Sequence, residues 1–566
     1  MHRYPSRSRV PGVAAMLLAA ACRGEVLPSE PLHPDPVANL GTQSAALAGG
    51  AASTEHMIVV ANTVLDGTST RAYTLRADAA GTATVLPLPD RANIAVARIA
   101  AESGSPGLDR AFEGRLRDME RTVLTPRIPH ARAWSAQRGA LREPMEGLSP
   151  TVRNGQRIPS VVKVGDVVRI NVQADSACSA PTYRGARVAA IGTRSIVLED
   201  TLNPRNGFVE ADYQRYAARF DTLVYPLDSA AFGAPTDIDG NGRIIMVFTR
   251  TVNERTARDA QTYVAGFTFA RDLFPIAGSP RTQACAGSNE GEYFYLLAPD
   301  PLGLVNGNRR TTRFVDSIAT AVIAHELQHL INAGRRIHVN SAPALEQKWL
   351  DEGLAHIAEE LLFYRESGLQ PRSNLGAASL RTTERVLQAY NRNMGGNQVR
   401  YRHFLQRPSR ASPVAPDDEL WTRGAAWSLL RYLADRTNPG GDDVFYRLVN
   451  SRSTGLGNAV GVFGPGLATL VRDWNVTHAT DDLPLAPQYQ QPSWNWKSIL
   501  ANIGTGGGYP LSVQPMSNGI AYSGTVLSGG ATYYRITVPA NAAATVSLTE
   551  QTGAAPTLSL VTVRIK

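Results

Sequence analysis

Two stretches in the middle of the chain have the apolar periodicity of buried helices. Between residues 315 and 331, apolar side chains recur at the i, i+3, i+4 and i+7 spacing, and Gly334 stands where a helix C-cap is expected. After Pro343, a second apolar stripe runs from residue 350 to residue 362. We therefore predict two core helices. Their apolar positions are Val315, Ile318, Ala319, Val322, Ile323, Leu327, Leu330 and Ile331 in the first, and Leu350, Leu354, Ile357, Leu361 and Leu362 in the second.

Apolar and polar residues alternate elsewhere, which predicts β-strands. Residues 111–121 and 421–435 return to helical spacing. About 540 mature residues exceed the size at which one core keeps growing, so the pattern predicts a multidomain α+β protein. The alternating segments are residues 57–62, 72–76, 161–172, 187–192, 197–200, 244–248, 533–538 and 544–548.

Changes in this pattern suggest four folded regions. We expect an N-terminal β module with a helix and a linker over 56–150, and a β barrel-like subdomain over 151–235. A domain with a mainly helical C-terminal half follows over 236–510, and a β-sandwich-like module over 511–566. Lys566 ends the chain inside a predicted strand, which leaves open that the last module is incomplete.

Residues 1–21 have the pattern of a secretory signal peptide. Three arginines within the first nine residues precede the apolar run 13–21, which ends in small residues and is too short to span a membrane. Cys22 follows directly and resembles the lipidated cysteine of bacterial lipoproteins, although Ala19 stands where leucine is usual. Residues 22–55 are then expected to be a disordered tether. We predict an exported protein that is either secreted or lipid-anchored to the bacterial cell envelope, with membrane contact only through Cys22.

Cys178 and Cys285 remain as a pair when Cys22 is set aside. In an oxidising compartment such a pair is typically a disulfide, and two buried free thiols are the alternative. Neither cysteine has the spacing of a metal ligand.

The formal net charge of +8 does not point to a nucleic-acid partner. Only four of the 57 basic residues are lysine, and the arginines are spread along the chain without a basic run. This bias is typical of a GC-rich coding sequence, so we predict no binding of nucleic acid.

A short acidic segment resembles the start of a calcium loop. Asp237, Asp239 and Asn241 alternate as oxygen donors, and Gly242 follows at the sixth position, as in an EF-hand. Position twelve is Phe248 instead of a bidentate glutamate, and a strand pattern replaces the second helix. An Asx-rich turn leading into a strand is the favoured interpretation, and Ca²⁺ bound by Asp237, Asp239 and Asn241 is the alternative.

The first core helix contains the segment His325-Glu326-Leu327-Gln328-His329. Residues four apart lie on the same helix face, so His325 and His329 can present two imidazole nitrogens to one ion, with Glu326 beside them. This is the H-E-x-x-H arrangement of zinc metallopeptidases. Catalytic zinc usually takes three protein ligands, and Glu352 at the start of the second helix is the predicted third. Two histidines on a solvated face, and a first-turn glutamate, are the alternatives.

Two histidines followed by a glutamate on the next helix resemble the gluzincin group of metallopeptidases. Residues 324–332 and 349–354 look like the corresponding segments of the hyicolysin family of secreted bacterial neutral proteases. The resemblance covers about residues 160–500 and implies a zincin-like catalytic domain over 236–510. It also implies Zn²⁺ bound by His325, His329 and Glu352, with Glu326 polarising the water in the fourth position.

The chain departs from the thermolysin-like pattern one turn after Glu352, where His356 replaces an acidic residue that orients a histidine ligand. Another carboxylate must take this place, because metal-bound histidines almost always donate their second N–H to a carboxylate or carbonyl. Asp351, Glu359 and Asp316 are the candidates, although a first-turn acid is the favoured interpretation of Asp351 and a solvated face that of Glu359 and Glu360. The group that stabilises the oxyanion is left open among Tyr364, Tyr432, Arg423 and His356.

These features predict an exported zinc endopeptidase that acts on protein or peptide substrates. One alternative is a surface-anchored binding protein that keeps a non-catalytic gluzincin scaffold. Others are a zinc aminopeptidase and a cell-wall amide hydrolase. An aminopeptidase needs an acidic anchor for the substrate amine, and no Gly-Ala-Met-Glu-Asn-like element precedes His325.

Overall fold

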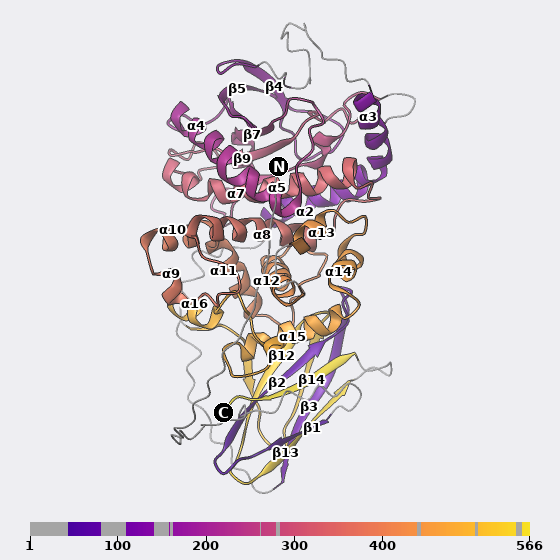
Figure 1. The fold of residues 1–566 in the computed structure, drawn as a ribbon, viewed down its shortest axis with the longest axis vertical. Helices are drawn as coiled ribbons and strands as arrows, with labels where there is room; N and C mark the ends of the chain where they lie inside the picture. The colour runs from indigo at the N-terminus through magenta and orange to yellow at the C-terminus, as the bar shows by residue number, and fades with distance from the viewer. Residues whose placement is uncertain are drawn as a thin grey trace, which may run out of the picture.

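A computed structural model describes residues 44–80, 109–140, 158, 162–260, 262–278, 283–437, 443–503, 508–550 and 557–566. The predicted signal peptide and Cys22 lie outside these residues. Figure 1 shows three layers along the long axis: a sheet with its helices, a helical layer, and a β-sandwich. The fold is mixed α and β, in agreement with the predicted class.

The first layer is built on a six-stranded sheet with the order β4-β5-β6-β7-β9-β8. β6, β7 and β9 are parallel neighbours, and the other pairs are antiparallel. Every residue of β7 and β9 is buried, as expected of central strands with both faces covered. The strands are β4 (Val167–Asn171), β5 (Tyr183–Ile191), β6 (Ser195–Asp200), β7 (Ile244–Thr249), β8 (Gly266–Phe267) and β9 (Tyr293–Leu297).

The predicted β barrel-like subdomain over 151–235 is wrong. β4, β5 and β6 form a hairpin-connected half of the same sheet, because β6 pairs in parallel with β7 across two intervening helices. These helices are α4 (Glu210–Arg219) and α5 (Tyr225–Phe232), and α6 (Arg250–Glu254) follows β7. The sheet therefore crosses the expected boundary at residue 236.

The long helix α7 (Thr312–Gly334) packs against β8 and β9, and Thr311 caps it by accepting a hydrogen bond from the Phe314 N–H. The next helix, α8 (Lys348–Ser367), lies between α7 and α12 (Leu420–Thr437) and is buried from Trp349 to Tyr364. A Cβ on Gly353 would come within 2.8 Å of Leu430, so glycine permits the close approach of α8 and α12. The remaining helices of this layer are α9 (Ala377–Leu380), α10 (Glu384–Asn393), α11 (Gly395–Leu405), α13 (Asp443–Val449), α14 (Gly455–Phe463), α15 (Leu467–Thr480) and α16 (Trp496–Asn502).

The third layer joins the two ends of the chain in one β-sandwich, so the prediction of separate N-terminal and C-terminal β modules is wrong. One sheet has the order β1-β13-β3-β11 and the other β10-β12-β2-β14. Alternate residues of both sheets meet in a shared core, and the outer face of the second sheet packs against α15. The strands are β1 (Ser44–Ala48), β2 (Thr54–Asn62), β3 (Thr70–Ala80), β10 (Val513–Pro515), β11 (Ala521–Leu527), β12 (Ala531–Val538), β13 (Ala543–Glu550) and β14 (Leu558–Arg564).

The expected tether over 22–55 also needs correction at its C-terminal end. β1 pairs with β13 and buries Ala45 and Leu47, and β2 already begins at Thr54. The short alternation Ala45 to Leu47 gives a strand only because β13 supplies its partner.

Helix α2 (Asp109–Met119) continues through residues 120–127 into α3 (Ile128–Ala140). Its apolar side chains belong to the core of the first two layers and not to the sandwich. The helix predicted at 111–121 is therefore present, but it lies against the domain that contains α7 and α8. The buried residues that anchor it are Phe112, Leu116, Leu124, Ile128 and Ala131.

Candidate metal centre

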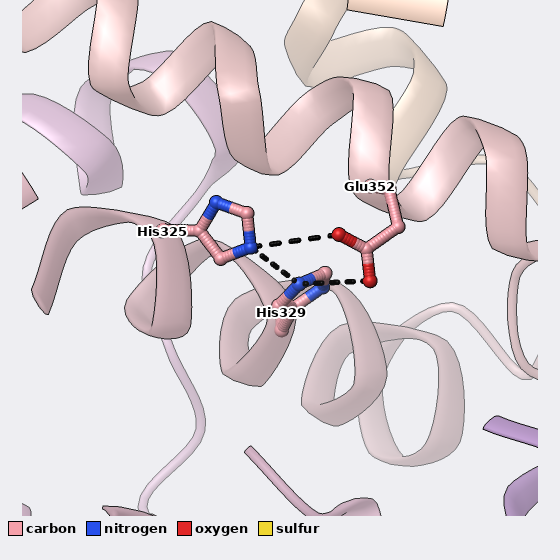
Figure 2. Close-up of side chains that lie close together, drawn as sticks. All are labelled: His325, His329 and Glu352. Atoms are coloured by element: carbon pink, nitrogen blue, oxygen red, sulfur yellow. Dashed lines mark hydrogen bonds and ion pairs between the residues drawn. The ribbon is translucent and has the colours of Figure 1, made fainter. Parts of the chain in front are cut away.

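The structure brings together the three predicted ligands. Figure 2 shows His325 and His329 projecting from α7 toward Glu352 on α8. The two histidine Nε2 atoms are 3.2 Å apart, and they lie 3.6 Å and 3.7 Å from the nearer oxygens of Glu352. Ligands that each bind zinc at about 2.0–2.2 Å must lie within about 4 Å of one another, so the donor set and its spacing fit this ion.

The other ring nitrogen of each histidine is held by a carboxylate. His325 Nδ1 lies 2.8 Å from Glu359 Oε1, and His329 Nδ1 lies 2.9 Å from Asp351 Oδ2. Asn332 Nδ2 donates to the second oxygen of Asp351 at 2.6 Å. These contacts leave Nε2 of both histidines for an ion, which is the usual arrangement at metal sites.

Glu359 thus supplies the carboxylate that orients a histidine ligand, the role for which the thermolysin-like pattern has an acidic residue one turn after Glu352. His356 occupies the place one turn after Glu352, and its Nδ1 is 3.1 Å from the same Glu359 oxygen. Asp316 is engaged elsewhere, since it accepts hydrogen bonds from Arg215 and Tyr216. The favoured solvated interpretation of Glu359 and Glu360 is wrong, because both side chains are buried.

Burial and neighbouring charges shift the pKa values of the side chains in the cluster. Burial lowers the pKa of His325, but Glu352 and Glu359 outweigh burial and raise it to about 10. Burial raises the pKa of Glu352, and Arg423 with His329 outweighs it, so the pKa lies well below its usual range. Burial also lowers the pKa of His356 to about 3, which keeps this imidazole neutral.

Arg423 on α12 binds Glu352 directly. Its Nη1 is 3.0 Å from Glu352 Oε2, and its other nitrogens bind Asp418 and Glu113. Of the four groups considered for the oxyanion, Arg423 forms an ion pair with a predicted ligand, and the ring of His356 lies against that of His325 at a centroid distance of 4.8 Å. Tyr364 donates instead to Glu360, Tyr432 to the Gln488 carbonyl, and His356 contacts Glu359.

Glu326 lies on the side of α7 that faces the edge strand β8. A Cβ on Gly266 of β8 would come within 3.2 Å of Glu326 Oε1, and Thr268 Oγ1 donates to the Glu326 carbonyl at 2.8 Å. Within the described residues, no hydrogen-bond donor reaches Glu326 Oε2. Burial raises the pKa of this carboxyl. The shift brings its pKa closer to a neutral working pH, and a general base is most effective when its pKa lies near that pH.

Helix α2 covers this region, a position that sequence reasoning missed. Arg117 lies 3.8 Å from Glu352 and 4.0 Å from Asp351, and Phe112 packs edge-on against Phe267 at 5.3 Å. Arg117 also lines a small cavity beside His329 and Asp351. With α2 and the neighbouring elements in place, His329 is only 3% exposed, Glu352 2% and Glu326 5%. The helical spacing of residues 111–121 predicts the helix, but nothing local in the sequence indicates what it covers.

The structure also places the remaining predicted residues. Cys178 and Cys285 form a disulfide. Asp237, Asp239 and Asn241 lie in the turn before β7, and the strand pattern at Phe248 is part of β7 itself. None of the helices in the described part of the chain is both long and apolar enough for a membrane span.

Comparison with known proteins gives one informative similarity. No protein-family model matches the chain. A stretch of 157 residues is 25% identical to the neutral metalloprotease ShpI of Staphylococcus hyicus, covering 28% of this chain and 32% of that protein. This similarity supports a relationship to metallopeptidases. Together with the His325-His329-Glu352 cluster, it supports a metalloprotease-like function and a metal cofactor.

Proposed function

We propose that the protein is a zinc endopeptidase of the gluzincin type, similar to the hyicolysin family, and that Glu326 is its general base. The observation that carries the proposal is the convergence of His325 Nε2, His329 Nε2 and a Glu352 oxygen, with Glu326 on the same helix turn. When bound, zinc lowers the pKa of a coordinated water to about 7 and polarises a carbonyl oxygen.

The protein residues divide the remaining work. Glu359 and Asp351 fix the ring orientation of His325 and His329, and Arg423 holds Glu352 in its ionised form. Glu326 Oε2, which has no donor among the described residues, accepts the proton of the attacking water and passes it to the leaving amine. Peptide hydrolysis then needs no covalent intermediate with the protein.

The edge strand β8 is the place we propose for the substrate backbone. β8 ends the sheet order and runs beside Glu326, and an extended peptide can add to such an edge through main-chain hydrogen bonds. Binding along a strand edge can position a peptide bond in the interior of a chain, so it favours an endopeptidase over an aminopeptidase. Because Phe112 packs on Phe267 of β8, the peptide must displace α2 to reach this edge.

We also propose that the protein acts outside the cytoplasm, either secreted or anchored through a lipid on Cys22. The signal-like pattern of residues 1–21 and the Cys178–Cys285 disulfide support this location.

The decisive experiment compares the purified full chain with Glu326→Gln and with Glu384→Gln, an exposed glutamate on α10. Bound zinc is measured by mass spectrometry, and cleavage by profiling a peptide library. We expect equal bound zinc in all three proteins. The unchanged chain and Glu384→Gln should cleave peptides at internal bonds, and the cleavage rate of Glu326→Gln should be lower by at least about 10²-fold. Bound zinc without Glu326-dependent cleavage would favour the binding protein with a non-catalytic scaffold. Removal of residues from peptide N-termini would favour the aminopeptidase.

A further inference from the structure

The turn before β7 and the residue before β9 lie side by side at one end of the central sheet. β7 and β9 are parallel neighbours with Ile245 opposite Tyr293, and the Ile245 N–H donates to the Glu292 carbonyl at 2.8 Å. This register places Glu292 next to the acidic turn formed by residues 237–242. One carboxylate oxygen from each of Asp237, Asp239 and Glu292 lies within 4.8 Å of the other two.

Glu292 is fully buried, and only one of its oxygens is satisfied. Oε1 accepts hydrogen bonds from Thr236 Oγ1 at 2.8 Å and from the Ile238 N–H at 2.9 Å. Oε2 is buried and receives no hydrogen bond from any described residue. A buried carboxylate oxygen without a partner is costly, so it is found where a proton or a cation compensates it.

The surrounding backbone holds the carboxylates close together. A Cβ on Gly291 would lie 2.8 Å from Tyr293 Cε2 and 2.9 Å from Asp239 Oδ2, so a side chain here would push the ring or the carboxylate away. Asn241 donates from Nδ2 to Asp239 at 2.6 Å, and its own Oδ1 accepts the Arg243 N–H at 2.7 Å. Asn241 therefore orients Asp239, and Glu292 is the third acidic oxygen donor.

We propose that Asp237, Asp239 and Glu292 bind a divalent cation, with Ca²⁺ as the ion that fits best. Carboxylate oxygens are the ligands of hard cations, and an arrangement of three of them without nitrogen or sulfur donors favours Ca²⁺ over Zn²⁺. Burial and, to a smaller extent, the nearby Asp237 charge raise the pKa of Glu292 to about 7.

This site revises the sequence interpretation in one respect. The Asx turn and the strand after it are present. In an EF-hand the last acidic ligand comes from position twelve of the loop, whereas here Glu292, the residue before β9, would supply it. Bound Ca²⁺ would tie the start of β7 to the start of β9. It would also fix Thr236, which lies against Gly334 at the end of α7. The role is structural, and it does not depend on the zinc chemistry.

The test uses the full chain with zinc bound, in buffer freed of calcium, and titrates CaCl₂ by calorimetry and by thermal unfolding. We expect one Ca²⁺ per chain and a rise in melting temperature with Ca²⁺ concentration. Glu292→Gln should weaken binding by about tenfold or more, since affinity follows the number of charged ligands. Glu384→Gln should bind as the unchanged chain does, and so should a His325→Ala, His329→Ala double variant.

Terbium luminescence gives an independent measurement if Glu292→Gln folds poorly. Tyr293 lies next to Gly291 and Asp239, close enough to sensitise Tb³⁺ in the site. Asp239→Asn should weaken this signal, and Ca²⁺ should displace it. Absence of both Ca²⁺-dependent heat and a melting shift in the unchanged chain would overturn the proposal, as would equal Ca²⁺ affinity in folded Glu292→Gln or in folded Asp239→Asn.

Discussion

Shortening Phe112 to alanine should increase peptide cleavage. Phe112 is 2% exposed and anchors α2 on Phe267 of the edge strand β8. Replacing a buried phenylalanine with alanine typically costs about 3–5 kcal/mol, and part of this cost falls on the packing of α2 over the site. Because about 1.4 kcal/mol changes an equilibrium constant tenfold, a loss of about 3 kcal/mol would raise the population with α2 displaced by roughly 100-fold, until that population saturates.

The assay is the cleavage of a labelled peptide at low substrate concentration, where the rate follows the fraction of protein that can bind. Bound zinc and the far-UV circular dichroism spectrum are measured in parallel. Phe463→Ala is the matched control, because Phe463 is a buried phenylalanine on a different helix, α14. A Phe112→Ala protein with normal zinc and fold but no gain in rate would refute the reasoning. An equal gain in Phe463→Ala would indicate general loosening and not the release of α2.

Three other perturbations have defined outcomes. Glu359→Gln should weaken zinc binding about 10–100-fold in a competition with a chelating dye, since Glu359 holds His325 Nδ1, whereas Asp316→Asn should leave it unchanged. Replacing Cys178 and Cys285 with alanine opens a loop with a sequence separation of 107 residues and should lower the free energy of unfolding in urea by about 2–5 kcal/mol. Without calcium, the pKa of folded Glu292 is about 7 and its ordinary value is 4.5, so the folded state retains a proton that the unfolded state releases. The contribution of Glu292 to stability should therefore fall as pH rises from about 4.5 to 7, by on the order of 3 kcal/mol. Glu292→Gln should remove this contribution from denaturation curves measured across that range, and leave the slopes due to other buried carboxyls such as Asp418 and Asp481.

The two helices that carry the candidate metal site could be predicted from the sequence because their signals are local. The apolar stripes place α7 and α8, and residues four apart on α7 put His325 and His329 on one face. The same helical spacing also predicts that Glu359 lies near the metal ligands. It stands seven residues after Glu352, two turns along the helix, so the two carboxylates lie on the same face of α8.

The parts that could not be predicted depend on partners far away in the chain. β2 and β3 read as strands, but their hydrogen-bond partners are segments near residue 530 and beyond. Glu292 has no pattern that links it to the acidic turn before β7, since only the parallel pairing of β7 with β9 brings them together. The position of α2 depends likewise on tertiary packing, which periodicity does not encode.

The shared sandwich has a consequence for how the protein forms. β2 lies between β12 and β14, and β3 between β13 and β11, so each of these early strands needs late strands on both sides. Until synthesis is complete, β2 and β3 present unpaired edges, which favour aggregation and slow folding. A shortened chain that lacks the last 50 or so residues would leave both strands without partners, so we expect it to be insoluble even with α7 and α8 intact. A single backbone cut between β3 and α2 should, in contrast, leave the N-terminal strands attached through their hydrogen bonds to the C-terminal ones.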